Sequence, residues 1–314
     1  MNKPFLWLAL LCLVSAEIHG KQISAQQQYT DTALNLSFSW LDRQKNTQSL
    51  AFAISNKALQ DQQEKVRAYR PQIADRNTFI ALQKAAASYD YKQVQINITQ
   101  QPHQLSWRVK ADDPELRSKV KAELAQAAKE AQQAYYKSNH YKLYTSPWGE
   151  EGVIPDHAYY MELSMEAMKP LGRLLKEKFP TISARQMADF ILPFVQSIPY
   201  VTQDSRITSA GLGYLPPLRV LAENRGDCDS KAVLMAAILK AVYPQLNAVM
   251  IYMPNHAMLG LRMPYLESDI KITADGINYL VAEVAGPGLF PLAEASDSSK
   301  NAIANNHFSV LELP

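Results

Sequence analysis

Three residues in the C-terminal half of the sequence, Cys228, His256 and Glu283, have side chains that together could carry out acyl transfer. A thiol can attack the carbonyl carbon of an amide, and an imidazole can take the thiol proton and later give it to the leaving amine. A carboxylate on the other ring nitrogen holds the imidazole in the required tautomer. Taken alone, each residue also has a structural interpretation: an inert core cysteine, a hydrogen-bonded histidine and a glutamate at a strand end. Their combination favours a nucleophile, a base and a residue that orients the base.

The residues around Cys228 predict the start of a buried helix. Gly226 interrupts the preceding chain, Asp227 is a preferred capping residue, and residues 232–239 are entirely apolar. A thiol in the first helical turn lies beside unpaired backbone N–H groups and the positive end of the helix dipole. Both favour the thiolate, so we expect a lowered pKa for the Cys228 thiol.

Three apolar runs after this helix, residues 246–253, 256–263 and 277–284, predict buried strands. The third run follows an Asp-Gly pair, which is a turn signal. If the last two strands pair antiparallel, the start of one lies opposite the end of the other. His256 begins the second run and Glu283 lies near the end of the third, so this pairing would make the two side chains neighbours.

The N-terminal half carries the patterns of a separate α+β module. Large apolar residues alternate over 34–40 and over 50–54, and a hairpin is indicated over 94–109. Pro114, with Asp113 placed as its cap, begins a long helix that extends to about residue 137. Further helical patterns cover residues 56–69, 77–89, 161–178 and 184–197.

The sequence thus predicts an α+β protein in two parts. A smaller N-terminal α+β module of unknown role covers residues 26–137, and a catalytic domain covers residues 157–314. Residues 138–156 show no clear period and contain two prolines and two glycines, which is typical of a linker.

The first residues have the layout of a secretory signal peptide. Lys3 precedes an apolar run over 5–14, and two small residues follow, so we expect a signal peptide at 1–16 with cleavage between 16 and 25. The run is shorter than the ~20 apolar residues of a spanning helix, so no permanent membrane span is expected. Cleavage removes Cys12, which lacks the context of a lipid-attachment site, and leaves a single thiol. A periplasmic or secreted location follows.

Composition and charge restrict the classes of partner and cofactor. Lys and Arg total 32 against 30 acidic residues, so no nucleic-acid partner is expected. Four histidines outside the proposed triad, at 103, 140, 157 and 307, lack ligand spacing, and no His-Glu-x-x-His motif occurs. We therefore expect neither a metal nor another cofactor.

Four segments resemble the transglutaminase-like cysteine hydrolases, a papain-related superfamily. They are Phe194-Val195-Gln196-Ser197-Ile198-Pro199-Tyr200, residues 217–229 with Gly226-Asp227-Cys228-Asp229, Asn255-His256-Ala257, and Tyr279-Leu280-Val281-Ala282-Glu283. Their order and rough spacing are also similar, and the resemblance covers about residues 161–288.

This resemblance implies a papain-like core, in which a Cys-bearing helix packs on an antiparallel sheet. It implies that Cys228 is the nucleophile, that His256 is the base, and that Glu283 takes the third position, where the family usually has aspartate. Gln196 falls where the family pattern often has a glutamine that could donate to an oxyanion together with the Cys228 N–H group. A polar residue near a helix end is the alternative interpretation of Gln196.

The sequence therefore predicts an exported cysteine hydrolase or acyltransferase that acts on amide bonds through a thioester, with peptide hydrolysis as the default. The substrate could be a protein, a small peptide or a cell-wall peptide. Two alternatives remain at this stage: a cross-linking transglutaminase, and a non-catalytic exported binding protein on the same fold.

Overall fold

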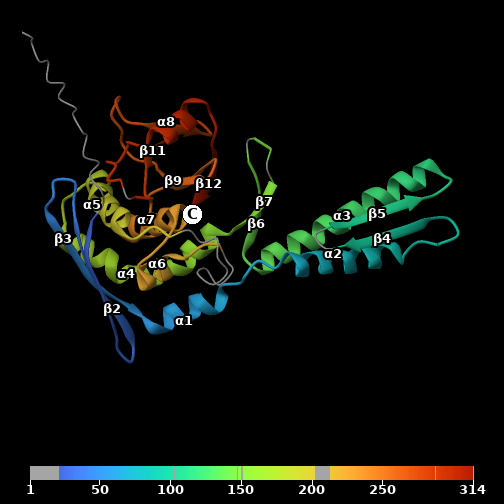
Figure 1. The fold of residues 1–314 in the computed structure, drawn as a ribbon, viewed down its shortest axis with the longest axis horizontal. Helices are drawn as coiled ribbons and strands as arrows, with labels where there is room; N and C mark the ends of the chain where they lie inside the picture. Colours follow the sequence, from blue (N-terminus) through green and yellow to red (C-terminus); the bar gives the residue numbers. More distant parts are fainter. Residues whose placement is uncertain are drawn as a thin grey trace, which may run out of the picture.

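The computed structural model describes residues 21–101, 104–146, 148–149, 151–201, 213–286 and 288–313. They form a body of helices and antiparallel sheets from which a long arm extends (Figure 1). The fold is therefore α+β, as predicted. The expected signal peptide at 1–16, with Cys12, lies outside the described residues.

Five strands of the body form one antiparallel sheet in the order β10-β11-β9-β8-β12. Their bounds are β8 (Ala248–Met253), β9 (His256–Leu261), β10 (Lys271–Ala274), β11 (Ile277–Ala282) and β12 (Ser309–Leu313). Met250 and Leu259 face the main core, whereas Ile251 and Met258 belong to a second cluster that includes residues of α8 (Asp297–Ala304). Because apolar layers cover both faces of this sheet, its inner strands β8 and β9 are nearly continuous apolar runs.

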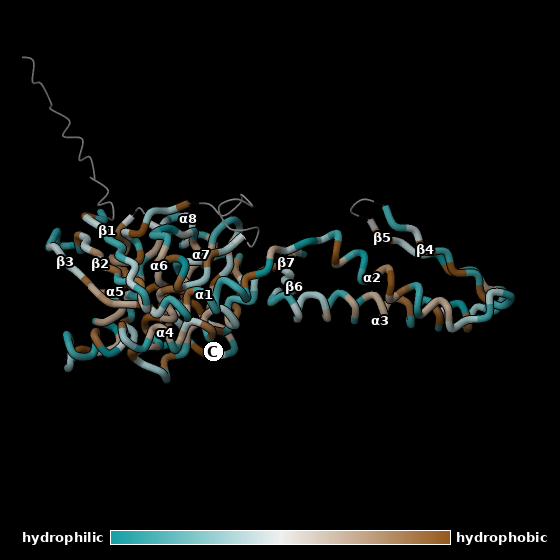
Figure 2. The backbone as a smooth tube through the Cα atoms, turned by 90° about the horizontal axis from the view of Figure 1, so that it is seen from below, coloured by the Kyte–Doolittle hydropathy of each residue, from teal (hydrophilic) through white to brown (hydrophobic). Residues whose placement is uncertain are grey.

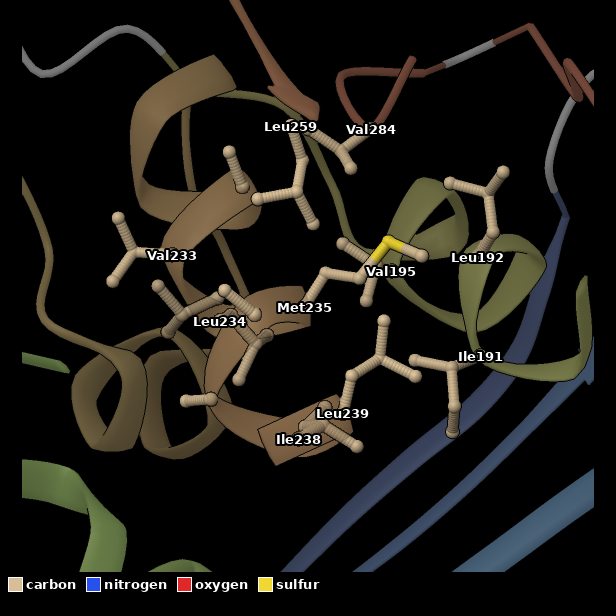
Figure 3. Close-up of a cluster of buried hydrophobic side chains, with 14 of the residues drawn as sticks. Ile191, Leu192, Val195, Val233, Leu234, Met235, Ile238, Leu239, Leu259 and Val284 are labelled. Atoms are coloured by element: carbon tan, nitrogen blue, oxygen red, sulfur yellow. The ribbon is translucent and has the colours of Figure 1, made fainter. Parts of the chain in front are cut away.

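Helix α7 (Cys228–Val242) lies at the centre of the body, and its residues 230–239 are all buried. Three helices surround it: α4 (His157–Lys178), α5 (Ala184–Ser197) and α6 (Pro217–Glu223). Figure 3 shows Ile191 and Val195 of α5 beside Met235 and Leu239 of α7. A helix that is apolar all round must be covered on all sides, and this one is.

A second sheet of the body contains β1 (Gln22–Tyr29), β2 (Ala33–Leu41) and β3 (Thr47–Ser55) in that order. Alternate residues of β2 are at most 2% exposed: Leu34, Leu36, Phe38 and Trp40. The Trp40 ring packs against Phe194 of α5, with 5.0 Å between ring centroids. These residues belong to the same hydrophobic core as α7, so the expected boundary at residue 137 does not divide the core.

The arm follows α1 (Asn56–Lys65) and consists of α2 (Pro71–Ala86), β4 (Gln95–Gln101), β5 (Gln104–Lys110) and α3 (Pro114–Ser138). Figure 1 and Figure 2 both show it projecting from the body. It has its own apolar cluster, with Leu82, Val109 and Leu124 at its centre. The predicted hairpin and long helix are confirmed, and the Asp113 side chain caps α3 by accepting from the Glu115 N–H at 2.9 Å.

Residues 138–156 were expected to form an irregular linker, but most of them form regular structure. Residues Tyr141–Thr145 (β6) and Glu151–Pro155 (β7) form an antiparallel hairpin between the arm and α4. Gly149, with φ of +86°, lies in its turn. Strands of five residues are too short to show a period in the sequence, which explains the error.

No helix in the described part of the chain combines the length and the apolar character needed to cross a bilayer.

Gly172 allows α4 and α7 to approach closely, because a Cβ at this position would lie 2.4 Å from the carbonyl oxygen of Ala241. We expect Gly172→Ala to force the helices apart and to lower the free energy of unfolding by about 1–3 kcal/mol. Gly152→Ala is the matched control, since a Cβ at residue 152 would have no neighbouring atom within 4 Å and its effect should stay within ~0.5 kcal/mol. Urea unfolding followed by circular dichroism measures both. Equal effects would contradict the proposed close approach.

Candidate active site

Cys228 is the first residue of α7, as predicted, and its side chain is partly buried. Asp227 caps the helix, and its Oδ1 accepts from the Ser230 N–H at 3.2 Å. The backbone groups of Ala257 and Asp229 lie near the thiol and favour its ionised form, which lowers its pKa. Because Ala257 directly follows His256, the thiol lies at the start of β9.

The sheet brings His256 and Glu283 together, which confirms their expected proximity. β9 and β11 pair antiparallel with Leu259 opposite Ala282, so the start of one strand meets the end of the other. His256 Nε2 is 2.5 Å from Glu283 Oε1, and the other carboxylate oxygen accepts from Ser299 Oγ at 2.9 Å. Glu283 is only 3% exposed. Since Nε2 is held by the carboxylate, Nδ1 is the ring nitrogen left to exchange a proton with the thiol.

The electrostatic surroundings of the thiol differ from those expected at a helix start. Burial raises the pKa of Cys228 from 9.0 to about 12, and the charges of Asp229 and Asp227 act in the same direction. The N–H groups of Ala257 and Asp229 lower it in part. The expected lowering of this pKa is therefore wrong for the free protein, because desolvation outweighs the helix start.

Two carboxyl groups flank the thiol and share a hydrogen bond. Burial and the neighbouring charge of Asp229 raise the pKa of Asp227 to about 9, so Asp227 keeps its proton at neutral pH. Asp229 Oδ2 also lies 3.0 Å from His157 Nε2, and Tyr252 Oη lies 2.6 Å from His157 Nδ1. Burial lowers the pKa of His157 to about 4. The chain of contacts therefore needs the neutral histidine, which accepts from Tyr252 and donates to Asp229.

Neither the contacts of His157 nor those of Lys231 were predicted from the sequence. The Lys231 side chain is fully buried one turn after Cys228. Its Nζ donates to the carbonyl oxygens of Ile198 at 2.5 Å and Ala285 at 2.8 Å, and it lies 5.9 Å from the centroid of the Tyr200 ring. Burial lowers the pKa of Lys231 to about 7. The amino group of Lys231 thus joins the segment after α5 to the segment after β11.

Gln196 has a different role from the expected oxyanion donor. Its Nε2 donates to the backbone carbonyl oxygens of Glu283 at 2.7 Å and Phe290 at 3.0 Å. Both amide hydrogens are used, and the opposite amide orientation would place three oxygens together. Gln196 therefore holds the main chain at Glu283 and has no hydrogen left for an oxyanion. Of the two expected oxyanion donors, Gln196 and the N–H group of Cys228, only the N–H group remains a candidate.

A cavity of about 780 Å³ opens beside His256 and Glu283. The other described residues that line it are uncharged: Tyr200, Pro254, Asn255, Ala285, Gly286, Gly288, Leu289, Phe290, Ser296 and Ser298. A cavity of this size next to an imidazole–carboxylate pair is suited to an organic ligand.

Among the described residues, no group of three or more His, Cys, Asp or Glu side chains is arranged to hold a metal ion. No family model, curated protein or solved structure matches the chain.

The raised pKa predicts how the thiol responds to pH. We expect the rate at which iodoacetamide alkylates the folded protein to keep rising from about pH 7 to about pH 10, because the thiolate fraction grows about tenfold per pH unit below the pKa. The same protein unfolded in urea is the control, and its rate should level off above ~8.5. Intact-mass kinetics at Cys228 measure both. A plateau of the folded protein below neutral pH would instead indicate a thiolate–imidazolium pair before substrate binds.

Proposed function

We propose that this protein is a cysteine hydrolase or acyltransferase of transglutaminase-like, papain-related type that acts on amide bonds through a thioester at Cys228. The observation that carries the proposal is the 2.5 Å contact between His256 and Glu283, made beside Ala257, whose backbone lies near the thiol. A buried carboxylate on one imidazole nitrogen and a thiol beside the same residue are the parts that acyl transfer requires.

In the first half of the proposed reaction, Cys228 Sγ attacks the carbonyl carbon of the substrate while His256 Nδ1 takes the thiol proton. Because the resting thiol is neutral, this transfer accompanies the attack. The carbonyl oxygen becomes an oxyanion, and the N–H group of Cys228, the first residue of α7, would stabilise it. His256 then gives its proton to the leaving amine, and the thioester remains.

In the second half, water attacks the thioester carbon and His256 takes a proton from it. The carbon–sulfur bond breaks, the thiol regains a proton from the imidazole, and a carboxylic acid leaves. An amine in place of water would give a new amide by the same steps. Glu283 stabilises the imidazolium during both halves, since its carboxylate is already in contact with Nε2.

We further propose that the enzyme is exported and acts as a peptidase in the periplasm or outside the cell. The support is the signal-like N-terminal sequence. Its cleavage would remove Cys12 and leave Cys228 as the one thiol of the mature chain. A protein, a small peptide and a cell-wall peptide are all compatible with an amide substrate.

A single experiment tests the proposed chemistry. The purified protein is mixed with p-nitrophenyl acetate, and mass spectrometry follows an acetyl group on Cys228 while absorbance follows the released nitrophenol. A panel of labelled peptides and cell-wall fragments then supplies amide substrates. We expect turnover by the wild type and none by Cys228→Ala or His256→Ala. Unchanged turnover in both variants would remove Cys228 and His256 from the chemistry. No acetyl-enzyme and no turnover in the wild type would favour a binding protein without catalysis.

The third residue has its own prediction. Glu283→Gln should lower turnover by about 100-fold or more, because the amide loses the negative charge and can present its NH₂ group to the imidazole. Glu283→Asp should retain more activity, since it keeps the carboxylate at a shorter reach. Glu267→Gln, at an exposed position between β9 and β10, is the matched control and should not change turnover. Wild-type turnover by a folded Glu283→Gln variant would remove Glu283 from the mechanism.

A further inference from the structure

We propose that the cavity beside His256 receives the leaving-amine side of the substrate and selects a neutral, apolar residue there. This inference rests on the proposed function and adds a substrate class to it. It concerns the amino acid whose nitrogen leaves during acylation, or the amine that accepts the acyl group in the reverse direction.

The position of the cavity indicates which side of the scissile bond it serves. His256 and Glu283 are among the described residues that line it, whereas Cys228 is not. In acyl transfer the acyl carbon becomes bonded to the nucleophile, and the base faces the leaving nitrogen, to which it gives a proton. A cavity that borders the base and not the nucleophile therefore continues from the leaving nitrogen.

The lining indicates which side chains fit. Tyr200, Leu289 and Phe290 supply aromatic and aliphatic surface, and Glu283 is the one charged side chain among the described lining residues. Both oxygens of Glu283 are already engaged, by His256 and Ser299, and the residue is 3% exposed. A charged substrate group would therefore lose its water without gaining an ion pair, which is unfavourable. An apolar side chain has no polar group to desolvate, and its transfer from water into the cavity is favourable.

The walls of the cavity are held in place before any substrate binds. One wall follows Ile198 and the other contains Ala285, and the buried amino group of Lys231 donates to the carbonyl oxygens of both. Gly286 crosses the backbone of Gln196 so closely that a Cβ would lie 2.5 Å from its carbonyl oxygen. A preformed apolar cavity gives a larger difference between matched and unmatched ligands than one that must first be ordered.

The selectivity can be measured on the acyl-enzyme, with one acyl donor and different acceptors. The thioester at Cys228 reacts with an acceptor amine, the carbon–nitrogen bond forms, the carbon–sulfur bond breaks, and His256 carries the amine proton to the departing thiolate. Amides of phenylalanine, leucine, aspartate and lysine present the same α-amine and differ in the side chain. When the acceptors are present at equal concentration, differences in product yield therefore reflect how the cavity accommodates the side chain and not the reactivity of the amine.

In the test, p-nitrophenyl acetate acylates the wild-type protein, and mass spectrometry compares the acetylated amino-acid amides with the acetate released by water. We expect phenylalanine and leucine amides to be acetylated at the α-amine at least ~10-fold more than aspartate and lysine amides. Equal transfer to all four, preference for a charged amide, or hydrolysis without transfer would overturn the inference while the proposed function stands. Absence of the acetyl-enzyme would overturn both.

A variant of the cavity wall provides a second, independent arm. Leu289→Arg should invert the preference toward aspartate amide, because it supplies the positive charge that the lining lacks. Leu143→Arg, at an exposed position on β6, is the matched control and should keep the wild-type preference. Circular dichroism establishes that both variants fold. A folded Leu289→Arg variant with the wild-type preference would show that the cavity does not hold the acceptor side chain.

Discussion

The antiparallel pairing of β9 with β11 determines where chemistry can take place in this protein. It sets His256, at the start of one strand, against Glu283, just after the end of the other. A shift of the pairing by one residue would turn alternate side chains to the opposite face and separate the two groups. Gln196 and Ser299 both hold Glu283 in position. Gln196 binds its main-chain carbonyl, and Ser299 binds its carboxylate.

Local patterns were sufficient to predict the elements that carry the candidate site. Asp227 as a cap before an apolar run predicts where α7 starts, and alternation over 34–40 predicts the strand that contains Trp40. They were insufficient for β1, whose glutamine-rich sequence becomes a strand through its pairing with β2. Likewise, β12 has no strong pattern and is defined by its partner β8. The boundary at residue 137 failed because the alternation in β2 does not reveal that its apolar face packs on α5.

The parts of the site that sequence reasoning missed depend on contacts between distant segments. His157 meets Asp229 across 72 residues, and Lys231 reaches Ala285 across 54. The pKa of Cys228 was predicted in the wrong direction because a helix start is a local property, whereas desolvation comes from the whole core. The result is a neutral thiol, a protonated Asp227 beside Asp229, and the buried amino group of Lys231 one turn away. Such buried polar groups are tolerated because each has hydrogen-bond partners.

The separate apolar cluster of the arm has a consequence for how the molecule unfolds. Leu82, Val109 and Leu124 contact each other and not the core around α7, so few interactions tie the stability of the arm to that of the body. The arm then forms a cooperative unit of its own, which can open and close while the sheet with His256 and Glu283 stays intact. Amide hydrogens of α2 and α3 would exchange through this local opening, whereas those of α7 would exchange only when the body itself unfolds.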